Sequence, residues 1–166
     1  MKLFRTYFLN KAIKKAETSL YIGWQKVETI TILYDAKEDA DCTFISTLIS
    51  ELEKDGKKTD LLNFAAIKRP KENPAPNTYY NQDVDIFGQP KKRVLQKHHL
   101  QMDVLINWTT MQDSPNDFIL AGAKCGLKIG VGKSLDCCDL VIKDQGENRQ
   151  KVINEILKYL KMINHD

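Results

Sequence analysis

Residues 130–134, Gly-Val-Gly-Lys-Ser, have the most evident capacity for chemistry, because glycine-rich turns with a lysine bind phosphate groups. A nucleoside-triphosphatase loop also needs a glycine five residues before the second glycine of this run, and that position is Leu127. Such a loop must open a helix, and residues 135–139 do not resemble a helix start. The segment therefore predicts a glycine-rich exit from a strand. Its candidates for contact with an anion are Gly130, Gly132 and Lys133.

Cofactor and metal chemistry have little support in the sequence. The turn after the first expected strand, residues 35–40, contains no glycine, so the dinucleotide fingerprint of Rossmann enzymes is absent there and we expect no cofactor. His98 and His99 are neighbours whose side chains diverge on a helix or a strand, and His165 lies near the C-terminus. The four cysteines lack CxxC spacing. We therefore expect no metal site, and we expect reduced thiols.

Nucleophilic catalysis has no strong candidate either. Ser46 and Ser50 lack the strand–turn–helix setting of a nucleophile elbow. Ser114 precedes a proline and an acidic residue, which is typical of a helix N-terminus, so we predict a capping role for it. Cys125 follows an alanine-rich helical segment and is predicted to be buried and inert.

The elements that position these residues alternate between strands and helices. This alternation predicts a doubly wound α/β fold over residues 27–166, with a mainly parallel sheet in a Rossmann-like three-layer sandwich. Strands are expected at 28–35, 59–67, 102–108, 127–131 and 139–142, with a further short strand or edge segment at 84–88. Residues 68–83 hold three of the five prolines and predict a long surface loop.

The carboxyl ends of the expected strands form the best candidate site, because open parallel sheets bind ligands beyond those ends. Two carboxylates there, Asp35 and Asp113, are candidates for a catalytic base. The alternative is that this edge holds ordinary polar loop residues. Tyr79 and Tyr80 either cover the crevice or pack against their own loop. The ligand-binding candidates are Asp35, Asn107, Thr109, Gly130, Gly132 and Lys133.

Charge is concentrated at the N-terminus. The chain of 166 residues carries a net charge of +3, which is too small to predict nucleic-acid binding. The first twenty residues hold five lysines or arginines and one glutamate, so they carry +4 and the remainder carries −1. Phe4, Phe8 and Ala12 recur with helical spacing and predict an amphipathic helix over 2–18, within an extension over 1–20.

The modest length of this helix and the interruptions in its apolar stripe favour a docked extension, in which the Phe4 and Phe8 side packs on the domain or on a second copy. The alternatives are a protein partner and an anionic membrane surface. The sequence has no apolar run of membrane-spanning length and no secretory signal. We therefore expect a cytoplasmic protein, with peripheral contact at the inner face of the membrane as the alternative.

Several segments carry a resemblance to known families. The basic N-terminal helix and residues 31–35, 85–90, 103–107 and 159–164 resemble a family of uncharacterised proteins typical of Bacteroidota, over nearly the full length. Residues 103–107, 120–124 and 128–130 are similar to the N-terminal half of glycosyltransferase family 9, the heptosyltransferases. That likeness implies an acceptor-side Rossmann-like domain. The catalytic Gly-Asp turn and the donor-binding domain of those enzymes are missing here.

Together these observations predict a non-catalytic binding or interaction module for a small anionic ligand or a protein partner. The alternative is an enzyme or enzyme fragment that acts on a phosphorylated or glycosyl substrate, with Asp35 or Asp113 as base and Lys133 as anion contact.

Overall fold

The computed structural model describes residues 2–15, 20–36, 43–97, 102–133, 135–144, 146 and 148–163. Some residues considered above lie outside the described part of the chain, and these are residues 16–18 of the expected first helix, Cys42, His98, His99, Ser134 and His165.

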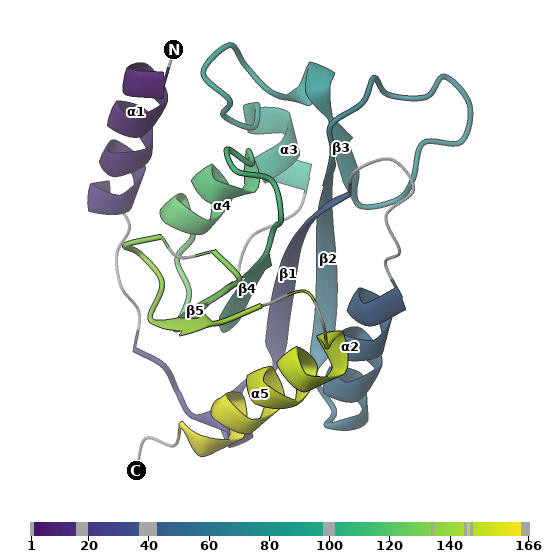
Figure 1. Ribbon diagram of the computed structural model, residues 1–166, viewed down its shortest axis with the longest axis vertical. Coiled ribbons are helices and arrows are strands. Elements are labelled where there is room, and N and C mark those ends of the chain that lie inside the picture. Colours follow the sequence, from purple (N-terminus) through teal and green to yellow (C-terminus); the bar gives the residue numbers. More distant parts are fainter. Residues whose placement is uncertain are drawn as a thin grey trace.

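The core is one sheet of six parallel strands, which confirms the predicted α/β class (Figure 1). The strands follow the order β3-β2-β1-β4-β5-β6 across the sheet, the order of a Rossmann fold. They are β1 (Thr29–Ala36), β2 (Lys58–Ala65), β3 (Thr78–Tyr80), β4 (Val104–Trp108), β5 (Leu127–Val131) and β6 (Leu140–Ile142). β1 and β4 are buried apolar runs because helices cover both faces of the sheet.

Helices lie on both faces of the sheet. The apolar stripe of α2 (Thr43–Lys54) and that of α5 (Arg149–Met162) cover one face, together with the turn η1 (Trp24–Lys26). The short α3 (Lys92–Lys97) and α4 (Asn116–Gly122) cover the other face. α1 (Lys2–Lys15) forms a further layer outside α4.

The third strand lies where the sequence predicted a loop. Residues 78–80 form β3 and pair with the end of β2, and Asn81–Asp83 form the turn η2, so the expected loop over 68–83 is too long. Tyr79 explains the difference, because its ring is buried against Phe64 at 5.1 Å between centroids. Residues 84–88, expected as a strand or edge segment, form only one antiparallel bridge. The Asp85 carboxylate accepts hydrogen bonds from two amides within the same segment, which bends it into a turn.

A buried carboxylate holds the start of the loop to its end. Asp83 accepts hydrogen bonds from the Tyr80 amide (2.9 Å), from Arg69 (2.8 Å) and from Arg93 (2.6 Å). Burial by itself would raise the pKa of Asp83, but these bonds and the charge of Arg69 outweigh it and hold the pKa below its ordinary value.

The hydrogen bonds to the Asp83 carboxylate predict that the folded protein loses stability in acid. Because the pKa of Asp83 is lower in the folded state than the unfolded value of about 3.9, its contribution is present above that value and is lost as the pH falls through the folded pKa. We expect Asp83→Asn to lower the free energy of unfolding by about 1–2 kcal/mol at neutral pH, and by less near pH 2. Urea unfolding at several pH values measures this. Parallel pH profiles for wild type and variant would contradict it.

Candidate functional site

The sheet reverses its winding between β1 and β4. β1 leads to α2 on one face and β4 leads to α4 on the other, so the two connections diverge at the carboxyl edge. In open α/β sheets the ligand crevice lies outside this switch point. The register places Tyr34 beside Trp108 and Asn107 beside Gly130, so the predicted site residues gather along one edge.

Asp35 lies at the switch point and binds the loop between β4 and α4. Its buried Oδ1 accepts hydrogen bonds from the Thr110 amide (2.6 Å) and hydroxyl (3.0 Å), and Oδ2 accepts one from the Met111 amide (3.1 Å). Hydrogen bonds to an ionised acceptor are the stronger ones. They hold the β4–α4 loop against the end of β1.

A second buried network supports the same loop. Asn116 begins α4, and its Nδ2 donates to the Tyr34 carbonyl (2.8 Å). The Tyr79 hydroxyl donates to Asn116 Oδ1 (2.7 Å). Burial, and after it the negative charges of Asp35 and Asp117, raise the pKa of Tyr79, so the phenol stays a proton donor. The Tyr80 hydroxyl accepts a hydrogen bond from the Ala75 amide and thus packs its own loop.

A pocket of about 250 Å³ lies beside this edge, between the ends of β4, β5 and β6. Of the six predicted ligand contacts, three line it: Thr109, Gly132 and Lys133. Asp35, Asn107 and Gly130 do not. Among the described residues, the lining consists of Trp108, Thr109, Thr110, Val131, Gly132, Lys133, Asp144, Gly146 and Arg149.

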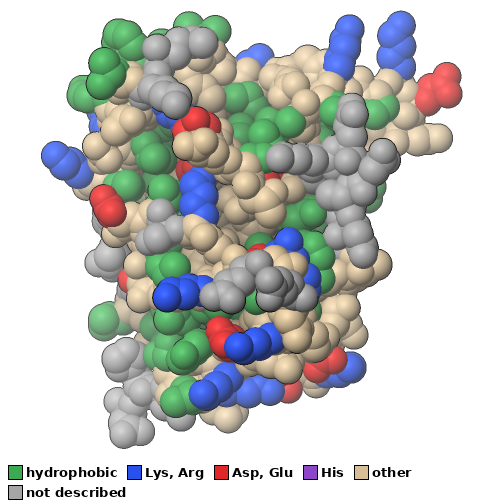
Figure 2. Space-filling model, viewed as in Figure 1, with side chains coloured by type: hydrophobic (Ala, Val, Ile, Leu, Met, Phe, Trp, Pro, Cys, Tyr) green, Lys and Arg blue, Asp and Glu red, His purple; other side chains and the backbone are tan. Residues whose placement is uncertain are grey.

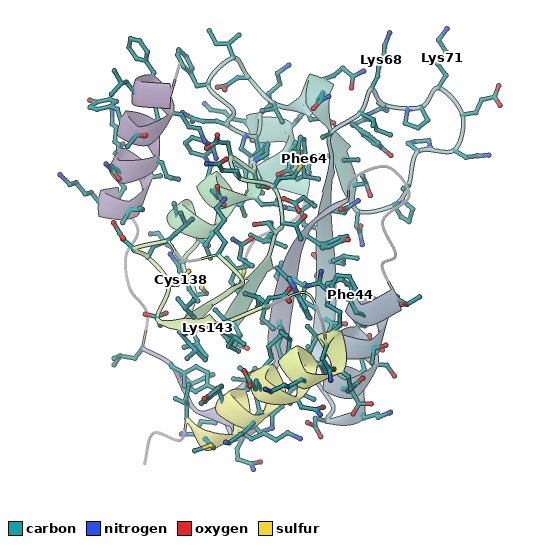
Figure 3. All side chains as sticks on the ribbon, in the orientation of Figure 1. Phe44, Phe64, Lys68, Lys71, Cys138 and Lys143 are labelled. Atoms are coloured by element: carbon teal, nitrogen blue, oxygen red, sulfur yellow. The ribbon has the colours of Figure 1, made fainter. Side chains whose placement is uncertain are left out.

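Two cations of the pocket are each held by one carboxylate. Lys133 Nζ lies 2.6 Å from Asp117 Oδ2. Arg149 pairs with Asp144, and its guanidinium stacks over Phe44 and Trp108 at 4.9 and 5.7 Å. Figure 3 shows Phe44 near the start of α2, next to the N-terminal end of α5. Both cations keep part of their side chains exposed, so they are oriented but not covered.

Thr109 is the unsatisfied group of the pocket. Its residue is 3% exposed, and its hydroxyl has no hydrogen-bond partner among the described residues. Asn107 lies two residues earlier, in β4, is also buried, and has neither its side-chain oxygen nor its side-chain nitrogen paired among the described residues. A buried polar group without a partner is destabilising, and in native proteins it often marks a site for a ligand or for water.

Asp117 connects the pocket to α1. Its Oδ2 accepts from Lys133 and also from Arg5 (3.1 Å), and Arg5 Nη2 donates to the Ser114 carbonyl as well (2.9 Å). Burial raises the pKa of Asp117, although the charges of Lys133 and Arg5 act in the opposite direction. Asp113 lies outside the pocket, with a side chain that is 60% exposed and 3.3 Å from Arg5.

Gly130 allows the β5–β6 loop to pack closely against β5. A Cβ at this position would lie 2.6 Å from the Lys133 carbonyl oxygen and 3.0 Å from Cys138 Sγ, so only glycine lets the β5–β6 loop fold back here. The neighbouring thiol of Cys137 lowers the pKa of Cys138, which is labelled in Figure 3. The described residues contain no group of three or more potential metal ligands.

Arg149 and Asp144 were not among the site residues predicted from the sequence. The sequence pattern could have identified both residues. Asp144 follows the expected strand 139–142 at the same carboxyl edge, and Arg149 begins the next helix. A larger cavity of about 890 Å³ lies at the opposite edge of the sheet. Its carboxylate Asp103 already accepts hydrogen bonds from the amides of Glu28 and Thr29, so it serves the start of β1.

Comparison with known protein families identifies the family of this chain. A family model with the description "Family of unknown function (DUF6913)" matches residues 2–163. The chain belongs to this family. The match runs from α1 to the end of α5, so DUF6913 includes the N-terminal helix as well as the sheet. No curated protein and no solved structure matches the chain. No helix in the described part of this DUF6913 chain is long and apolar enough to cross a membrane.

Proposed function

We propose that the protein is a non-catalytic binding module that takes a small oxyanion, such as a phosphate or carboxylate group, in the pocket at the carboxyl edge. The observation that carries the proposal is the buried, unpaired hydroxyl of Thr109 in a pocket that also contains Lys133 and Arg149. A pocket lined by a hydroxyl-bearing residue and two cations is a complementary environment for an anion.

The two cations support this proposal through their orientation. Asp144 and the rings of Phe44 and Trp108 fix the plane of Arg149, and Asp117 fixes Lys133. A guanidinium has five N–H donors, so its pairing with one carboxylate leaves donors for a ligand. Because these side chains are already ordered, a ligand loses less of its binding free energy to ordering them.

The positions of the carboxylates favour binding over turnover. Asp35 is occupied by three hydrogen bonds to the β4–α4 loop, and Asp113 lies outside the pocket. Asp144 lines the pocket but already accepts from Trp108 Nε1 (2.8 Å), from the Gly146 amide (2.9 Å) and from Arg149. A general base needs a free acceptor within reach of the substrate.

Thr109→Val tests the proposal, because valine has nearly the same shape but no hydroxyl. Without ligand we expect the variant to be more stable than wild type by about 1 kcal/mol, since an unpaired buried hydroxyl is removed. With inorganic phosphate, glucose 6-phosphate, UDP-glucose or citrate, we expect at least one to raise the unfolding midpoint of wild type. A ligand at a hundred times its dissociation constant adds about 2.7 kcal/mol. This increase should be absent in Thr109→Val.

The adjacent threonine provides the control for stability. Thr110 donates its hydroxyl to Asp35, so Thr110→Val should lose stability where Thr109→Val gains it. A wild-type protein that responds to none of the anions would overturn the proposal, and so would an equal response of Thr109→Val.

The enzymatic alternative shares the same ligand class. A phosphorylated or glycosyl substrate would occupy the same edge, and turnover lost in Asp35→Ala would support that alternative. The likeness to glycosyltransferases, the bacterial source and the cytoplasmic location stay predictions from the sequence.

A further inference from the structure

One side of α1 is docked on the domain. Arg5 reaches Asp117 and the Ser114 carbonyl, and its guanidinium lies 4.8 Å from the ring centre of Phe118 in α4. Phe8 packs on Phe87 with 5.0 Å between ring centroids. These contacts fix which side of the helix faces outward.

The outward side of α1 combines apolar and basic residues. Leu3 is 87% exposed, Phe4 62% and Tyr7 60%. In the adjacent loop, Ile86 is 80% exposed and precedes Phe87, whose ring lies 6.4 Å from that of Phe4. Figure 2 shows hydrophobic side chains gathered over this end of α1, at the upper left.

The second half of the outward side is basic. Lys11, Lys14 and Lys15 are exposed, and Lys2–Lys15 contains no acidic residue. Leu3, Tyr7, Lys11 and Lys14 follow one another along a single stripe of the helix, at spacings of three and four residues.

We propose that this outward side of α1, with Ile86, docks on an anionic lipid bilayer. Clustered exposed apolar side chains mark interaction surfaces, and aromatic residues favour the headgroup region. Each lysine near an anionic surface adds an attraction that salt weakens. The opposite side of α1 is held by α4, so the helix lies along the membrane surface.

Sedimentation with vesicles of phosphatidylcholine, with and without phosphatidylglycerol, tests the proposal on the full chain. We expect binding only to the vesicles with phosphatidylglycerol, and weaker binding in high salt. Lys11→Glu/Lys14→Glu should reduce the partition coefficient by at least about tenfold. Leu3→Ser/Tyr7→Ser should also reduce it by about tenfold or more, because it removes apolar area that enters the bilayer.

Matched controls separate this surface from general charge and hydrophobicity. Lys68→Glu/Lys71→Glu makes the same charge change on the β2–β3 loop, far from α1 (Figure 3), and Met162→Ser removes an exposed apolar side chain at the end of α5. Both should bind vesicles like wild type. The replaced side chains point outward, so unchanged unfolding midpoints would verify that the variants are folded.

Three outcomes would overturn the proposal. They are a wild type that binds neither type of vesicle, α1 variants that bind like wild type, and a dimer in light scattering that Leu3→Ser/Tyr7→Ser dissociates. The last outcome would assign the surface to a second copy of the chain. Vesicle binding by Thr109→Val should equal that of wild type, which distinguishes α1 from headgroup capture in the carboxyl-edge pocket.

Discussion

Asp35→Asn is expected to lower the free energy of unfolding by about 3 kcal/mol. The carboxylate of Asp35 accepts three hydrogen bonds through its two oxygens, from the amides of Thr110 and Met111 and from the Thr110 hydroxyl. An asparagine has one acceptor oxygen, and its amino group would face a donor at the other position. The β4–α4 loop would therefore lose part of its attachment to β1. Chemical denaturation at neutral pH measures the loss.

Asp113→Asn, in the β4–α4 loop that Asp35 binds, is the matched control. Its side chain is 60% exposed and its ion pair with Arg5 is at the surface, so the change should be below about 1 kcal/mol. Equal effects of the two variants would contradict the structural role given to Asp35. A stable Asp35→Asn that loses turnover of a glycosyl or phosphorylated substrate would instead favour the enzymatic alternative.

Two buried asparagines are expected to respond in opposite directions to the same substitution. Asn116→Leu should lower the free energy of unfolding by about 3 kcal/mol, because the Tyr79 hydroxyl and the Tyr34 carbonyl would lose their partner inside the protein. Asn107→Leu should raise it by about 1–2 kcal/mol, because both polar atoms of Asn107 are unpaired among the described residues.

Denaturant unfolding of both leucine variants and of wild type tests whether the two substitutions change the free energy of unfolding in opposite directions. Leucine and asparagine are similar in size, so the comparison isolates the hydrogen bonds from the packing. If Asn107→Leu is destabilised as strongly as Asn116→Leu, Asn107 has a hydrogen-bond partner. The interpretation that the carboxyl edge of the sheet holds unpaired polar side chains would then be wrong.

Much of the fold follows from local patterns in the sequence. The strands predicted at 28–35 and 102–108 match β1 and β4 to within two residues, because a parallel strand covered on both faces is a mostly apolar run. Ser114 was predicted to cap a helix, but Pro115 occupies the N-cap position of α4 and Ser114 lies one residue before it; its hydroxyl accepts a hydrogen bond from the Asn116 amide. The strand-end rule brought Thr109, Gly132 and Lys133 to one edge, because parallel strands end on the same side.

Other features required the tertiary structure, because they depend on residues far apart in the chain. The sequence does not show that the Asp35 carboxylate accepts hydrogen bonds from Thr110 and Met111, or that Arg149 of α5 lines the pocket. It also placed the third strand in the wrong segment, since three residues of β3 carry too short a pattern, and pairing with β2 decides their structure.

The sequence by itself therefore determined the class of fold and most of its elements, and it predicted the edge at which the candidate site lies. These properties depend on periodicity and on turn residues within about ten positions. The tertiary structure decided the strand order, which polar groups are already satisfied, and which side of α1 is left exposed. Those properties depend on pairing and burial between segments that the chain itself does not place side by side.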